Sequence, residues 1–205
     1  MLDFSGLDLA VGLALALSGY LCGSIPFGLL LTRMAGLGDV RDIGSGNIGA
    51  TNVLRTGSKT IAALTLIADV LKGTTPALVG MKLGGEAGGL VAGTGAFLGH
   101  VLPVWLKFQG GKGVATFLGV LFGLAWPLAL IFVAVWIGLA LVLRMSSVSS
   151  LAGAWAMPVA AYAIGRPGLA AGLAGLAAVV LVKHRTNIVR IFKGEESKIS
   201  LVGKG

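Results

Sequence analysis

Long apolar stretches, separated by short polar and glycine-rich segments, dominate the pattern of this sequence. The first covers approximately Leu9–Leu31, lacks the basic start of a cleaved signal peptide, and is interrupted at Gly23-Ser24-Ile25-Pro26. Further apolar stretches cover approximately Thr60–Met81, Gly88–Leu106, Val114–Ala125, Pro127–Leu143, Ser149–Ile164 and Gly168–Val182. A membrane-spanning helix needs about 20 apolar residues, so the pattern predicts seven such helices, the last four of them short.

The composition agrees with a membrane protein and excludes several other classes. Of the 205 residues, 56% are hydrophobic and 12% are charged, and the mean hydropathy is +0.93. Soluble domains usually carry about 25% charged residues, so this chain lacks the charge to cover a water-facing surface. The 34 glycines follow no Gly-X-Y period, which excludes collagen. We predict an all-α integral membrane protein with one domain over residues 1–205 and a loosely ordered tail after about residue 191.

Small residues within the apolar stretches predict that the helices pack closely. This is our interpretation of the glycines at positions 88, 89, 93 and 95. Cys22 is the only cysteine, so it cannot form an internal disulfide, and its apolar surroundings indicate a packing role.

The basic residues predict an orientation in the membrane. The net charge is +8, but no Lys/Arg run is interleaved with aromatic residues, so we expect no nucleic-acid partner. Trp126-Pro127 is compatible with a kink or a turn, and a turn gives the stronger charge asymmetry. With a turn there and the N-terminus outside, two basic residues lie outside, Lys82 and Arg166, and Lys72 lies within a span. Thirteen lie inside: Arg33, Arg41, Arg55, Lys59, Lys107, Lys112, Arg144, Lys183, Arg185, Arg190, Lys193, Lys198 and Lys204. Basic loops stay in the cytoplasm, so we predict an external N-terminus and a cytoplasmic C-terminus.

The polar segment at residues 41–55 is rich in groups that bind anions. Its glycines, Gly44, Gly46 and Gly49, permit positive φ, so that successive backbone N–H groups can face one point. Its side chains add neutral donors and fixed positive charge: Arg41, Ser45, Asn47, Thr51, Asn52 and Arg55. The alternative is an ordinary Gly/Asn turn that caps a helix.

A second glycine-rich segment, Phe108–Thr116, also combines backbone donors with a cation. It contains Gly110, Gly111, Lys112 and Gly113, and we expect a helix to begin there and to place Thr116 near the donors. A Walker A loop needs Ser or Thr directly after the lysine, and Gly113 stands there. The alternative is a loop whose lysine contacts lipid headgroups.

Two further groups of polar residues stand out. Asp69 and Lys72 share a helix face within an apolar stretch, so they can pair, either to hold helices in register or to bind substrate. His184 and Asn187 follow the last stretch with helical spacing, and a histidine there can transfer a proton near neutral pH. For His100 we expect a hydrogen-bonding role at the end of a helix.

These segments together resemble the bacterial acyl-phosphate:glycerol-3-phosphate acyltransferases of the PlsY type. The resemblance covers essentially the whole chain and is carried by Gly23-Ser24-Ile25-Pro26-Phe27-Gly28, Gly44–Asn52, Asp69-Val70-Leu71-Lys72-Gly73, His100–Thr116 and Lys183–Arg190. It implies a seven-helix enzyme of the bacterial inner membrane with a cytoplasmic active site. Such an enzyme makes 1-acyl-glycerol 3-phosphate from acyl phosphate and glycerol 3-phosphate, without coenzyme A, a metal or another cofactor. No obligate protein partner is inferred.

The residue types fit direct transfer of the acyl group. No serine lies in Gly-x-Ser-x-Gly, Cys22 has no evident activating partner, and the fifth residues after His100 and His184 are Trp105 and Val189, so no His-x₄-Asp motif is present. We expect the hydroxyl of glycerol 3-phosphate to attack the acyl phosphate directly. The catalytic residues that we expect are His184, Asn187 and Lys112. Either His184 or the donor's phosphate takes the proton.

Two other functions compete with this interpretation. A transporter or channel for anionic solutes would also carry ionisable residues inside the membrane, but we find no internal repeat, and the polar segments gather on one predicted side. A structural subunit would not need the glycine-rich loops.

Overall fold

The computed structural model describes residues 6–199, which form helices and no strands. The described residues group into two compact units that divide between residues 126 and 127. The first unit holds α1 (Leu9–Gly23), α2 (Phe27–Met34), α3 (Ala50–Val53), α4 (Lys59–Val101) and α5 (Val114–Leu124), with short 3₁₀ turns at Val40–Asp42, Leu54–Thr56 and Val104–Leu106. The second holds α6 (Trp126–Leu143), α7 (Ser146–Ala163), α8 (Pro167–Lys183) and α9 (Arg185–Phe192).

The predicted interruption of the first apolar stretch is confirmed. Asp8 caps the start of α1, because its side chain accepts hydrogen bonds from the backbone N–H groups of Ala10 and Val11. The helix ends at Gly23, and α2 begins directly after Pro26. Proline has no N–H to donate, so it suits the start of a helix and not its interior.

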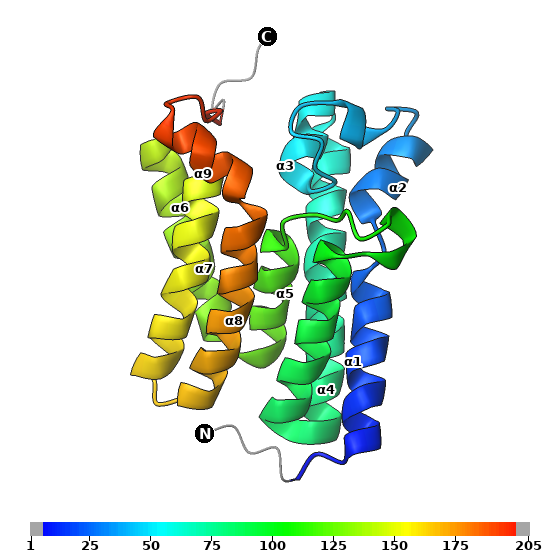
Figure 1. Ribbon diagram of the computed structural model, residues 1–205, viewed down its shortest axis with the longest axis vertical. Coiled ribbons are helices and arrows are strands. Elements are labelled where there is room, and N and C mark those ends of the chain that lie inside the picture. The colour runs from blue at the N-terminus through cyan, green and yellow to red at the C-terminus, as the bar shows by residue number, and fades with distance from the viewer. Residues whose placement is uncertain (1–5, 200–205) are drawn as a thin grey trace. The chain divides into compact units, whose positions relative to one another are not determined.

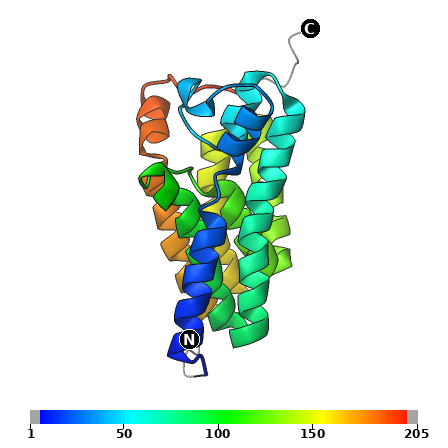
Figure 2. The same cartoon turned by 90° about the vertical axis from the view of Figure 1, so that its right-hand side faces the viewer.

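Helix α4 is a hairpin of two helical limbs. Gly84 and Gly85 have non-helical backbone angles, with φ +58° and ψ −153° at Gly85. The limbs then run back along each other: a Cβ on Gly80 would overlap the carbonyl of Gly88. Figures 1 and 2 show the turn at the end of the first unit opposite to α2 and α3. Two of the predicted apolar stretches are therefore the two limbs of α4.

Glycines let the helices of the first unit approach to backbone contact, as the sequence predicts. An added Cβ would overlap a backbone carbonyl of the neighbouring helix at several positions where α1 meets the second limb of α4: Gly19 on Ala92, Gly23 on Ala96, Gly95 on Ala16 and Gly99 on Tyr20. The first limb of α4 contacts α5 in the same way, with Gly73 on Thr116 and Gly119 on Val70. Thr74 Oγ1 adds a hydrogen bond to the carbonyl of Gly119 at 2.9 Å.

The second unit is made of the remaining apolar helices. Helix α5 of the first unit ends at Leu124, because the next residue, Ala125, has a φ of −163° and a ψ of 85°, which are not helical. Trp136 Nε1 of α6 donates to Ser150 Oγ of α7 at 3.0 Å. Helix α8 meets α9 at His184 with a bend of 60°.

The number of membrane spans differs between the sequence prediction and the helices. By length and composition, three helical stretches of the described residues can cross a membrane, or four if α8 and α9 form one bent span. One reason for the lower number is that Lys59–Leu106, which the sequence divides into two spans, counts as one helical stretch. Another is that α5 has 11 residues, or roughly 17 Å of helix against a hydrocarbon core of about 30 Å. Seven spans therefore stay a prediction.

Candidate functional site

The loop between α2 and α3 is held in shape by the buried side chain of Asn52. Its Nδ2 donates to the backbone carbonyls of Val40, Ile43 and Asn47 at 2.8–3.1 Å, and its Oδ1 accepts from the N–H of Ser45 at 3.0 Å. Gly44 and Gly46 have φ of +55° and +68°, which confirms the predicted use of positive φ at two of the three glycines. Asn52 therefore organises the loop, and both ends of its side-chain amide are already hydrogen-bonded within it.

The groups that this loop presents to a ligand are mainly at its rim. Ser45, Gly46, Thr51 and Arg55 are exposed, and Asn47 and Gly49 are partly exposed. The helix that follows the loop, α3, has only four residues, so a helix dipole contributes little to binding there. The N–H groups of Ser45, Gly46 and Gly49 already donate within the loop, so the predicted cradle of N–H groups is not open at these positions. Binding by this loop depends on its hydroxyls and on Arg55, whose NH1 also donates to Asn52 Oδ1 at 3.1 Å.

Arg41 is already paired with an acidic residue that sequence analysis did not single out. Its Nε and NH2 donate to the two oxygens of Asp39 at 2.9 and 2.6 Å, and Arg33 NH2 adds a third bond at 2.8 Å. The hydrogen bonds from Arg41 hold the pKa of the Asp39 carboxyl far below its usual range, and Asp39 in turn raises the pKa of Arg41. Arg41 donates two of its five N–H groups to Asp39, so the remaining donors can still bind a phosphate.

Asp69 and Lys72 form the predicted ion pair deep inside the first unit. Their Nζ and Oδ1 atoms are 2.7 Å apart, and each side chain is 2% exposed. Lys72 Nζ also donates to the carbonyl of Ile25, in the break between α1 and α2, at 2.7 Å. His100 Nδ1 lies 3.7 Å from Asp69 Oδ1. This burial supports the structural alternative, in which the pair holds helices in register.

The second glycine-rich loop leads directly into α5. Trp105 and Tyr20 fix the segment before it, because Trp105 Nε1 donates to Ser24 Oγ and the Tyr20 hydroxyl donates to the carbonyl of Leu102, both at 2.7 Å. Gly113 precedes the helix with φ +84°, and a Cβ there would overlap the ring of Phe97. Helix α5 therefore begins where we predicted, two residues after the half-buried Lys112.

Thr116 does not lie at the surface of this loop. It is fully buried, and its carbonyl faces Gly73 across the contact between α4 and α5. The close approach of the two helices at Gly73 explains this burial. The prediction that Thr116 contacts a phosphate therefore does not fit its position, although Gly110, Gly111, Lys112 and Gly113 remain candidates.

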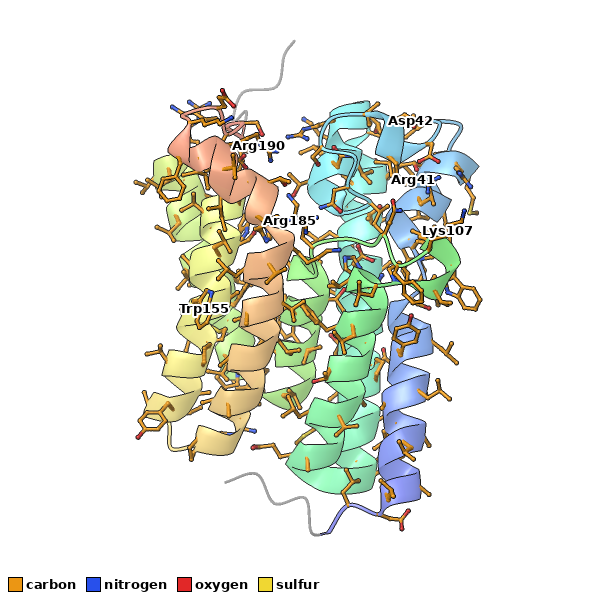
Figure 3. The ribbon with its side chains drawn as sticks, viewed as in Figure 1. Arg41, Asp42, Lys107, Trp155, Arg185 and Arg190 are labelled. Atoms are coloured by element: carbon orange, nitrogen blue, oxygen red, sulfur yellow. The ribbon has the colours of Figure 1, made fainter. Side chains whose placement is uncertain are left out.

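The two glycine-rich loops lie towards the same end of the first unit. Figure 3 shows Arg41 on the loop after α2 and Lys107 on the loop after α4, both away from the N-terminus of α1 and from the α4 turn. Two loops that the charge pattern assigns to one side of the membrane are thus on one side of this unit.

In the second unit, His184 and Asn187 are both buried beside the bend between α8 and α9. His184 Nδ1 lies 2.8 Å from the carbonyl of Val180. Asn187 Nδ2 donates to Glu196 Oε1 at 2.6 Å, and Ser147 Oγ donates to the same oxygen at 2.7 Å. Arg190 Nε pairs with Glu196 Oε2 at 2.8 Å. Burial raises the pKa of Glu196, but these three hydrogen bonds outweigh it and lower the pKa overall.

A family model for glycerol-3-phosphate acyltransferase matches residues 13–194, which include both loops and the His184 segment. The chain belongs to the glycerol-3-phosphate acyltransferase family. A member from Brucella anthropi is 58% identical over 185 residues, covering 90% of this chain and 92% of the relative. One from Brucella ovis is 59% identical with the same coverage.

Solved structures of an acyltransferase of this family have the same fold. The crystal structure of PlsY, an integral membrane glycerol 3-phosphate acyltransferase, in its glycerol 3-phosphate form has a TM-score of 0.88 and 36% identity, covering 92% of this chain and 96% of that one. The lysophosphatidic acid form gives 0.86 and 35%, with coverages of 92% and 95%. The family resemblance stated from the sequence is confirmed, and the protein is an integral membrane acyltransferase.

Sequence analysis of this acyltransferase missed two acidic residues that position candidate site groups. Asp39 pairs with Arg41, and Glu196 holds Asn187 and Arg190. A usable signal was present, because the chain has only 8 acidic residues and both lie among basic neighbours. Residues beyond about 191 were expected to be loosely ordered. Helix α9 does end at Phe192, but Glu196 makes these contacts beyond it.

Proposed function

We propose that this protein transfers an acyl group from acyl phosphate to the sn-1 hydroxyl of glycerol 3-phosphate, which gives 1-acyl-glycerol 3-phosphate and inorganic phosphate. The observation that carries the proposal is the similarity to PlsY in its glycerol 3-phosphate form over 92% of the chain. The comparisons favour an acyltransferase over an anion transporter. The reaction is the entry step of phospholipid synthesis, and we assign it to the cytoplasmic face of the bacterial inner membrane.

The two glycine-rich loops suit a reaction between two phosphate-bearing substrates. Ser45 and Arg55 bind one phosphate through the Ser45 hydroxyl and the Arg55 guanidinium. Lys112 binds or bridges the phosphates, with the N–H groups of Gly110 and Gly113 around it, whereas the N–H of Gly111 donates to the carbonyl of His100. Positioning of the reactants contributes several kcal/mol to lowering the barrier, and each key donor to the developing negative charge about 3–4 kcal/mol.

The transfer needs no covalent acyl-enzyme. The glycerol hydroxyl oxygen forms the new ester bond to the acyl carbon, the bond from that carbon to the phosphate oxygen breaks, and phosphate leaves with the electron pair. Phosphate is a good leaving group near pH 7, so no strong general acid is required. Cys22, the one thiol, has its Sγ 3.8 Å from the carbonyl of Lys72, a contact that does not activate a nucleophile.

We assign the proton of the attacking hydroxyl to His184. A carbonyl oxygen can only accept, so the 2.8 Å contact with Val180 places a ring proton on Nδ1, and in this proposal Nε2 is the nitrogen that takes the hydroxyl proton. Asn187 orients the hydroxyl or the histidine. If the variant His184→Ala keeps most of kcat, the donor's phosphate takes the proton instead.

The membrane arrangement of the proposal follows the charge pattern. Seven spans, with α4 contributing two through its hairpin, put the N-terminus outside and the C-terminus in the cytoplasm. The acyl chain of the donor lies among the helices while its phosphate reaches the loops. The reaction requires no metal, coenzyme or protein partner.

The test of this proposal compares two acyl donors with purified enzyme. Palmitoyl phosphate or palmitoyl coenzyme A is incubated with glycerol 3-phosphate, and both phosphate and 1-acyl-glycerol 3-phosphate are measured. We expect equal amounts of the two products from palmitoyl phosphate, none from the thioester, and a loss of at least about 100-fold in kcat/KM for Lys112→Ala. Product from the thioester alone would refute the donor assignment, and near-normal turnover of Lys112→Ala would refute the role of the second loop.

A further inference from the structure

A series of buried polar contacts connects the break between α1 and α2 to the loop that carries Lys112. It begins at the carbonyl of Ile25, which accepts from Lys72 Nζ, and continues through the ion pair of Lys72 with Asp69, both at 2.7 Å. The same carboxylate oxygen lies 3.7 Å from His100 Nδ1. His100 is 4% exposed, so these contacts lie away from solvent, where electrostatic attraction is weakly screened.

His100 is the residue at which this series meets the loop. A Cβ on Gly111 would overlap Nε2, Cε1 and Cδ2 of the His100 ring, and a Cβ on Gly110 would overlap its carbonyl oxygen. The N–H of Gly111 donates to that carbonyl at 3.1 Å. Both glycines therefore rest directly on His100. Its Nδ1 faces Asp69, and its Nε2 faces Gly111 of the loop.

We propose that His100 is a positioning residue for Lys112. Lys112 follows Gly111 in the chain, so the place of its Cα depends on how Gly111 rests against the ring. Asp69 lies beside Nδ1 of the ring and pairs with Lys72, which the carbonyl of Ile25 holds in place. His100 contacts no substrate in this role. The inference rests on the proposed function, in which Lys112 binds a substrate phosphate.

The kinetic test is a double-mutant cycle between His100 and Gly111. His100→Ala removes the surface on which the loop rests, and Gly111→Ala pushes the loop off the ring, so each raises the KM of the anionic substrates at least about 10-fold while kcat falls less. In the double variant the new methyl group occupies space that the ring has left, so the two effects do not multiply. Multiplied effects, or an unchanged KM in His100→Ala, would overturn the proposal.

A matched control separates positioning from a general loss of packing. Thr74→Val removes the buried hydrogen bond to the carbonyl of Gly119 but touches neither His100 nor the loop. We expect it to lower the unfolding temperature without raising KM. An equal rise in KM would contradict the specific role of His100. If His100→Ala does not fold, His100→Asn, which keeps a polar group towards Asp69, is used in the same cycle.

A second readout is independent of the reaction, so that its failure is distinct from failure of the proposed function. Lys112→Cys is prepared with Cys22→Ala and labelled with a nitroxide, with and without His100→Ala. We expect the spectrum to show restricted motion with His100 present and clearly faster motion in His100→Ala. Equal mobility in both proteins would overturn the proposal even if the acyl-transfer assay succeeds.

Discussion

Asn52 organises the loop after α2 with both ends of its amide. Its Nδ2 donates to three backbone carbonyls, and its Oδ1 accepts from the Ser45 N–H. The surrounding core, Leu29, Val40, Ile48, Val53 and Ala62, buries the apolar side of the loop. Asn52 Oδ1 also accepts from Ser45 Oγ at 3.4 Å and from Arg55 NH1 at 3.1 Å, so both groups are held in place before substrate arrives, which lowers the cost of binding an anion.

We predict that Asn52→Asp disables this loop. The substitution replaces the donor with a carboxylate oxygen that faces carbonyls, and each buried group left unsatisfied costs about 1–3 kcal/mol. We expect kcat/KM to fall roughly 100-fold or more, measured by phosphate release from palmitoyl phosphate with glycerol 3-phosphate. An unchanged kcat/KM would show that the loop does not need this amide.

Residue types alone revealed much of the candidate site, but not the function of each residue. The density of donors at 41–55 and the i,i+3 spacing of Asp69 and Lys72 are local features, and both were confirmed as a positive-φ loop and an ion pair. The burial of Thr116 and the internal role of Asn52 depend on contacts between distant segments, such as Gly73 with Thr116. Such contacts leave no periodic signal in one sequence.

At the scale of elements, glycine contacts determine how α1, α4 and α5 pack. In a membrane, helices gain no hydrophobic free energy by leaving lipid for one another, so close backbone approach and van der Waals contact carry more of the association. The hydrophobic periodicity predicted where helices lie. The predicted break between Thr60–Met81 and Gly88–Leu106 is confirmed by the non-helical backbone of Gly84 and Gly85.

We predict different outcomes for two Gly→Ala variants of α1. A Cβ on Gly19 would overlap the carbonyl of Ala92, whereas a Cβ on Gly12 meets only Leu7 Cδ2 at 3.5 Å, an ordinary contact. Gly19→Ala should destabilise the protein by about 1–3 kcal/mol, and the matched control Gly12→Ala should be neutral or stabilise it by up to about 1 kcal/mol. Thermal unfolding in detergent measures both. Equal midpoints for the two variants would argue against backbone contact at Gly19.

The connection from α9 back to α7 through Glu196 makes stability depend on pH. The folded-state pKa of Glu196 is lower than its ordinary value of 4.5, so its stabilising contribution is present above that value. It is lost as the pH falls below 4.5 towards the folded-state pKa. We expect Glu196→Gln to lower the unfolding temperature near neutral pH and to reduce the loss of stability on acidification.

Glu195→Gln is the matched control for this prediction, because Glu195 is exposed and adjacent. It should leave the midpoint near neutral pH and its acid dependence unchanged. A wild-type protein whose stability does not fall below pH 4.5 more steeply than that of Glu196→Gln would contradict the account.

At the scale of the whole molecule, the distribution of basic residues predicts the orientation of the chain. Composition alone identified an integral membrane protein, which the family assignment confirms. The predicted number of seven spans is not confirmed by helix length and hydropathy, because α5 is shorter than a bilayer and the two limbs of α4 count as one stretch. Helix length and hydropathy do not reveal such arrangements, which depend on neighbouring helices.

We predict that the C-terminal segment lies in the cytoplasm. Ser197→Cys in a Cys22→Ala background should resist an impermeant thiol reagent added to intact cells and should react after the cells are opened. A cysteine at the α4 turn, Lys82→Cys, should react in intact cells. Labelling of Ser197→Cys before lysis would refute the orientation.

The central claim is that glycerol 3-phosphate attacks the acyl phosphate directly. The most direct measurement is rapid-quench phosphate release from radiolabelled-acyl palmitoyl phosphate with enzyme in stoichiometric amounts, first without glycerol 3-phosphate and then with it. The account predicts no burst of phosphate before glycerol 3-phosphate is added, and afterwards equal amounts of phosphate and 1-acyl-glycerol 3-phosphate. A burst of one phosphate per enzyme without the acceptor, with labelled acyl group bound to the protein, would contradict it.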